Sequence, residues 1–184
     1  MRVERVRAAA RRAASMGLLL ALAMALNLAE SMVPPLPVLP PGVKLGLSNL
    51  VTVYCLFYLG SGEAWGIAVL KSGFVFLTRG ATAGALSLAG GVLSLCAMAA
   101  ARRLFAGRYF PVSMAGAVFH NIGQLCAAAV LLKNAAVFYY LPVLLAAGAL
   151  MGWATAALLR AVMPALKRVA AAPINDQKHS GKDG

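Results

Sequence analysis

The chain has 184 residues, of which 61% are hydrophobic and only 12% are charged, and its formal net charge is +12. Soluble globular domains carry about 45–50% apolar and about 25% charged residues, so this composition excludes an ordinary soluble domain. The 17 basic residues lie almost wholly between and beyond long apolar runs, which indicates membrane topology rather than binding to nucleic acid. We therefore expect an all-α bundle of about six transmembrane helices.

Six apolar segments follow one another along the chain, at about residues 14–33, 45–59, 64–78, 83–101, 113–132 and 138–163. The first, fourth, fifth and sixth approach or exceed the ~20 residues that cross a bilayer as a helix. The second and third hold about fifteen residues each, and a helix of that length covers only ~22 Å. These two either thin the bilayer locally or form a re-entrant hairpin within the protein. Either arrangement leaves an even number of crossings.

The start of the chain also resembles a signal peptide, because a basic stretch precedes the first apolar run. The run continues to Val33, so we expect an uncleaved first helix. Basic residues cluster before the first segment, before the fifth and after the sixth, whereas the other side keeps Lys44, Arg79 and Lys133. The positive-inside rule then predicts cytoplasmic termini. We expect a basic amino terminus (1–13), a transmembrane domain (14–168) and a disordered tail (169–184).

A few polar side chains are stranded in or beside the apolar runs, and they are the candidate ligand-binding residues. Inside a bilayer each costs a few kcal/mol unless it faces a partner, a cavity or a ligand. Of these polar residues, we assign Asn27 to packing. The others are Glu30, Lys44, Asn49, Lys71, His120, Asn121 and Gln124.

The densest polar group is His120, Asn121 and Gln124, which share about one turn of a predicted helix. They serve either as hydrogen-bonding contacts between helices or as ligand contacts. The stretch from Lys44 to Asn49, which contains Gly46, leads into the second predicted helix. It is either an anion site at the amino terminus of that helix or a simple helix start with a snorkelling lysine.

Glu30 and Lys71 carry opposite charges inside predicted helices, and an ion pair between them is the structural explanation. A charged ligand that separates the two is the alternative. On the first helix, Ala21, Ala25 and Ala29 form a smooth stripe that permits close approach of another helix.

Catalytic motifs are absent from the sequence. It has no phosphate-binding GxxxxGK[ST] loop, no paired aspartates for Mg²⁺, and no cysteine or histidine spacing typical of a metal site. We therefore expect no catalytic residue, no cofactor and no bound metal, and any ATP energy must come from other subunits.

Four strings carry a family resemblance: residues 41–52 (PGVKLGLSNLVT), 87–95 (SLAGGVLSL), 115–124 (AGAVFHNIGQ) and 140–143 (YLPV). They resemble the bacterial Gx transporter family, whose members are often labelled heptaprenyl diphosphate synthase component I. The resemblance covers about residues 15–165. The family is similar to the substrate-binding S components of energy-coupling-factor (ECF) vitamin transporters.

The resemblance implies a six-helix fold in the bacterial cytoplasmic membrane that binds a small, vitamin-like molecule from the outer side. Its partners would be a transmembrane coupling subunit, packed on the alanine stripe, and ATPases. The alternative is a non-catalytic membrane subunit associated with heptaprenyl diphosphate or menaquinone synthesis.

Overall fold

In the computed structural model, the described residues are 2–32, 48–106 and 108–171, and for residues 2, 8, 11, 30, 31 and 162–171 only the backbone is described. This part of the chain contains six α-helices, one 3₁₀ helix and no strand, so the expected all-α fold is confirmed. The elements are α1 (Arg2–Met32), α2 (Asn49–Tyr58), α3 (Ser61–Arg79), α4 (Ala81–Leu104), α5 (Tyr109–Leu132), η1 (Ala135–Tyr140) and α6 (Leu141–Ala171).

Within the described residues, four helical stretches are long and apolar enough to cross a membrane: Val3–Ala29, Ala81–Leu104, Tyr109–Leu132 and Ala135–Ala161. They correspond to the first, fourth, fifth and sixth predicted segments, and they make this a membrane protein. Helix α2 has 10 residues, so it rises only ~15 Å, about half of the hydrocarbon core. Helix α3, with 19 residues, rises ~28 Å.

The helices extend beyond the apolar runs that predicted them. Helix α1 already begins at Arg2, because arginine and alanine are strong helix formers. Helix α4 continues through Arg102 and Arg103 to Leu104, and α5 begins at Tyr109 with Pro111 in its first turn, where proline needs no backbone donor. The predicted tail from residue 172 onward lies outside the described residues.

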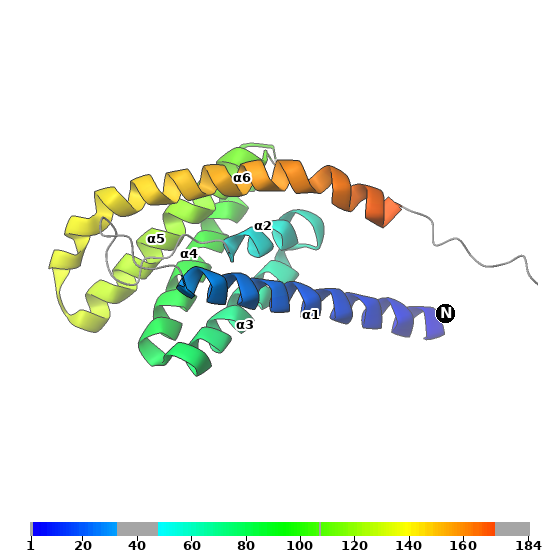
Figure 1. The fold of residues 1–184 in the computed structure, drawn as a ribbon, viewed down its shortest axis with the longest axis horizontal. Helices are drawn as coiled ribbons and strands as arrows, with labels where there is room; N and C mark the ends of the chain where they lie inside the picture. Colours follow the sequence, from blue (N-terminus) through cyan, green and yellow to red (C-terminus); the bar gives the residue numbers. More distant parts are fainter. Residues whose placement is uncertain (1, 33–47, 107, 172–184) are drawn as a thin grey trace, which may run out of the picture.

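Helices α3, α4, α5 and α6 pack against one another in chain order, and α1 packs on α2 and α3. The short α2 lies between α1 and α6 (Figure 1) and contributes Val51, Val53 and Leu56 to the core. Glycines bring the backbones close together: a Cβ on Gly123 (α5) would lie 2.6 Å from the carbonyl oxygen of Ala89 (α4). Such small residues are typical of membrane helix interfaces.

One end of the bundle gathers several polar contacts that join helix ends. Arg12 of α1 forms a salt bridge with Glu63, at the start of α3. The guanidinium of Arg102, near the end of α4, donates to the backbone oxygen of Leu56 in α2. The hydroxyls of Tyr58 and Tyr109 join the end of α2 to the start of α5. The amino end of α1 and the carboxyl end of α6 lie on one side of the molecule (Figure 1).

Candidate ligand-binding site between α2, α5 and α6

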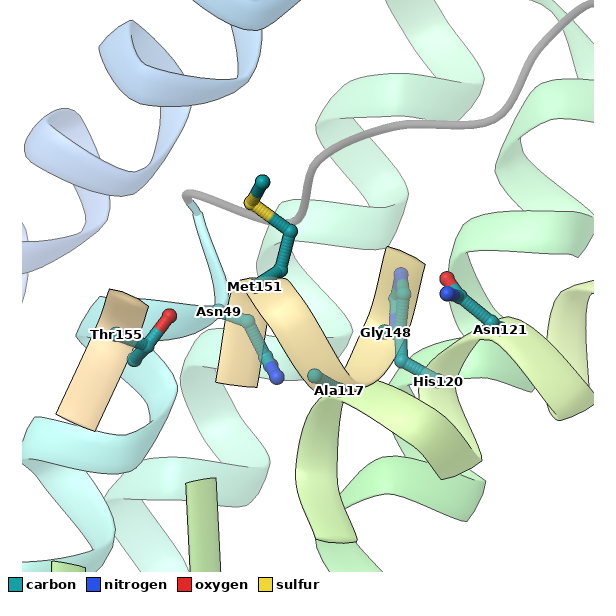
Figure 2. Close-up of a pocket in the computed structure, with 7 residues that line it drawn as sticks. All are labelled: Asn49, Ala117, His120, Asn121, Gly148, Met151 and Thr155. Atoms are coloured by element: carbon teal, nitrogen blue, oxygen red, sulfur yellow. The ribbon is translucent and has the colours of Figure 1, made fainter. Parts of the chain in front are cut away.

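A small pocket opens where α2, α5 and α6 meet (Figure 2). Its empty volume is about 270 Å³, part of which is open to solvent. Only about 10 Å³ of this space can hold the centre of a water molecule, which is room for about one water in this structure. Its described lining consists of Asn49 from α2, Ala117, His120 and Asn121 from α5, and Gly148, Met151 and Thr155 from α6.

The pocket lies at mid-depth in the bundle. His120 and Asn121 are near the middle of α5 (Tyr109–Leu132), ~16 Å from either end at 1.5 Å per residue. Both side chains are buried, with exposed fractions of 8% and 5%. Burying a polar group at this depth costs free energy unless the group has a hydrogen-bond partner. The partners of each side chain therefore indicate which of its polar atoms remain for a ligand.

Asn49, the first residue of α2, is held by a short hydrogen-bond chain. Its Nδ2 donates to Ser94 Oγ in α4 at 3.4 Å. Ser94 in turn donates to the backbone oxygen of Gly116 in α5 at 2.8 Å. Since Asn49 and Ser94 are both buried, this chain fixes the amino end of α2 against α4 and α5.

Asn121 is held from the other side of the pocket. Its Nδ2 donates to the backbone oxygen of Leu144 in α6 at 2.8 Å. A Cβ on Gly148 would lie 3.0 Å from the same Nδ2 atom, so the absence of a side chain there leaves room for the amide. The α5–α6 contact therefore positions Asn121 at the pocket.

His120 and Gln124 both pack against α4 at Gly90. A Cβ on Gly90 would lie 2.9 Å from the His120 ring and 2.9 Å from Gln124 Cγ. His120 also lines the pocket, whereas Gln124 is half-buried and is not among the described lining residues. The predicted polar turn is thus divided between the pocket and the α4–α5 interface.

Lys71 is buried in α3, with an exposed fraction of 2%. Its Nζ donates to Ser48 Oγ at 3.3 Å, and Ser48 directly precedes the pocket residue Asn49. A separate pair, Ser72 and Ser87, joins α3 to α4 at 3.2 Å. Lys71 therefore lies behind the amino end of α2, outside the described lining of the pocket.

The remaining predicted site residues are placed as follows. Lys44 lies outside the described residues, and for Glu30 only the backbone, within α1, is described. The stripe residues Ala21, Ala25 and Ala29 are exposed on α1, while Ala23 and Asn27 are buried.

Three residues of the site were not among the site residues predicted from the sequence: Met151 and Thr155 in the lining, and Ser94 behind Asn49. The spacing Gly148-x-x-x-Gly152 was a usable signal for the α6 face, because glycines four residues apart favour a close helix contact. A Cβ on Gly152 would indeed lie 2.6 Å from Met114 Cα in α5.

The lining offers amides, an imidazole, a hydroxyl and a thioether, which bind by hydrogen bonding and packing. In the described part of the chain, no three His, Cys, Asp or Glu side chains group closely enough to hold a metal ion.

Comparison with known proteins gives one match. The family model described as heptaprenyl diphosphate synthase component I matches residues 19–162, a range that contains every described lining residue of the pocket. No curated protein and no solved structure gives a significant match. Because the family model covers most of the 184 residues, the chain belongs to the heptaprenyl diphosphate synthase component I family.

Proposed function

We propose that the protein is the substrate-binding membrane component of a bacterial uptake system for a small, vitamin-like molecule, which it captures from the outer side of the cytoplasmic membrane. The observation that carries the proposal is the mid-depth pocket, where α2, α5 and α6 bring polar side chains together inside an otherwise apolar bundle. Polar residues at this depth mark substrate pathways in membrane proteins. Glu30, Lys44, Lys71 and Gln124 remain proposed contacts around this centre.

Partner subunits would supply the energy for transport. The sequence has no phosphate-binding loop of its own. The exposed alanine stripe on α1 (Ala21, Ala25, Ala29) is a smooth surface on which a helix of a coupling subunit would pack. In this scheme ligand binding shifts the population toward an occluded state, and partner ATPases drive inward release.

Uptake in cells tests the site. We expect Asn49→Ala and Asn121→Ala each to reduce uptake of the ligand that co-purifies with the wild-type protein, identified by mass spectrometry. Ser87→Ala, which removes a buried hydroxyl from the separate Ser72–Ser87 pair, is the matched control. If uptake in both pocket variants equals that of the control, the proposed site is wrong.

The second candidate is a non-catalytic membrane subunit associated with heptaprenyl diphosphate synthesis, and the family name favours it. Its partner would be a synthase subunit. It predicts that deletion lowers long-chain prenyl diphosphate or menaquinone levels and leaves solute uptake unchanged. Co-purification with a coupling subunit and an ATPase, and unchanged prenyl diphosphate levels after deletion, would instead support the uptake role.

A further inference from the structure

We propose that the pocket selects an uncharged ligand that carries two or more N–H or O–H donors. The inference rests on the proposed function, because it names the chemical class of the ligand that the same pocket binds. It follows from the way the protein uses the two carboxamides of the pocket, Asn49 and Asn121. In both, one N–H of the amide donates to a protein acceptor, and the amide oxygen is left as an acceptor for the ligand.

The orientation of the Asn121 amide is fixed by its partner. Leu144 contributes a backbone carbonyl oxygen, which accepts hydrogen bonds and cannot donate them. The group within 2.8 Å of it must therefore be the NH₂ group of Asn121. No other hydrogen bond joins Asn121 to the described residues, so its Oδ1 is the acceptor left at the pocket.

The Asn49 amide is oriented by a longer chain. The carbonyl oxygen of Gly116 accepts the only O–H of Ser94, at 2.8 Å. The Ser94 oxygen can then only accept, so it faces the NH₂ group of Asn49 at 3.4 Å. The second pocket amide is thus also left with its oxygen as the open acceptor among the described contacts, while each NH₂ group keeps its second N–H.

Two amide oxygens favour a ligand that donates hydrogen bonds, and Thr155, whose hydroxyl both donates and accepts, is compatible with it. An anion would be repelled by these oxygens. A cation finds no carboxylate among the described lining residues. An uncharged donor is the remaining class.

Uracil and 1,3-dimethyluracil form a suitable probe pair, because the two rings differ only in that methyl groups replace both N–H donors. Binding of each to the full-length protein in lipid nanodiscs is measured by saturation-transfer NMR. We expect uracil to bind about tenfold or more tightly, since each lost donor leaves a buried amide oxygen unsatisfied. Equal binding, tighter binding of the methylated ring, or binding of neither overturns the inference.

Ser94 supplies a second test, as a positioning residue that acts through Asn49. In Ser94→Ala the Asn49 amide loses its acceptor and is free to rotate, so the preference for uracil over 1,3-dimethyluracil is expected to fall about threefold or more. Ser113→Ala is the matched control, because the buried Ser113 hydroxyl has no hydrogen-bond partner among the described residues. An unchanged preference in Ser94→Ala, in a protein that unfolds at the wild-type temperature, contradicts the positioning role.

The two probes report on the chemistry of the pocket, and the uptake assay reports on the function. Loss of uptake in Asn121→Ala together with equal binding of both probes would reject the donor class and keep the transport role. A preserved preference for uracil together with unchanged uptake in the pocket variants would keep the donor class and reject the transport role.

Discussion

Gly123 determines how closely α4 and α5 approach each other. A Cβ at this position would lie 2.6 Å from the Ala89 carbonyl oxygen and 2.9 Å from Gly90 Cα, and both are backbone atoms that move only with the whole helix. Gly123→Ala should therefore separate α4 from α5 and destabilise the fold by about 1–3 kcal/mol. Unfolding in mixed micelles, followed by circular dichroism, measures the change.

Gly73→Ala is the matched control, because a Cβ at Gly73 in α3 would have no heavy atom within 4 Å. Its stability should stay the same or rise slightly, since alanine favours a helix more than glycine does. If both variants unfold alike, the close α4–α5 contact does not contribute to stability in the way that the geometry requires.

The sequence predicted the residues that are conspicuous in an apolar helix and missed those that are not. Asn49, His120 and Asn121 were visible because amides and imidazoles are costly in a bilayer. Thr155 and Met151 are unremarkable in a membrane helix, so only the packing of α6 on α5 reveals them. Gln124 shares a helical turn with His120. Whether each side chain faces the pocket or the α4–α5 interface depends on where α4 and α6 pack on α5, and helix periodicity does not define these packing positions.

At the scale of elements, α2 is a half-length helix held at both ends. Its amino end is fixed through Asn49 and Ser94, and its carboxyl end through Arg102, whose guanidinium donates to the Leu56 oxygen and lies 5.5 Å from the Phe57 ring centroid. Arg102→Ala should release the carboxyl end, because a backbone oxygen and an aromatic ring lose their cationic partner. We expect faster hydrogen exchange of the backbone amides of residues 49–60.

Arg103→Ala removes the same charge from the next position, where the side chain is exposed and makes no described hydrogen bond or ion pair. Exchange in α2 should remain at the wild-type rate in this variant. Equal acceleration in both variants would attribute the effect to the net charge of the α4 end and not to the Arg102 contact.

Hydropathy predicted the order and type of the helices but not where they end. Some predicted segments ended at a charged residue, for example before Arg102 and before Lys133, because charge lowers hydropathy. Arginine nonetheless continues a helix well, and long basic side chains reach the headgroup level, so α1 and α4 extend into the charged stretches. The start of α2 was not readable either: the predicted segment began at residue 45, because Leu45 and Leu47 continue the apolar character toward the amino end, whereas α2 begins at Asn49.

At the scale of the whole molecule, the contacts between helix ends constrain the topology. The Arg12–Glu63 salt bridge places the α2–α3 turn at the level of the basic amino terminus. The Tyr58–Tyr109 contact places the start of α5 beside the same turn. If the amino terminus is cytoplasmic, as the basic residues predict, this turn also faces the cytoplasm and η1 lies at the outer face.

Cysteine labelling tests this arrangement in a variant that lacks the native Cys55, Cys96 and Cys126. A membrane-impermeant maleimide should label Ala135→Cys, in the exposed η1, in intact cells, because η1 lies at the opposite end of α5 from the basic turn. Gly62→Cys, in the α2–α3 turn, should be labelled only after the membrane is permeabilised. Labelling of Gly62→Cys in intact cells would place the Arg12–Glu63 pair outside and reverse the direction from which the pocket is filled.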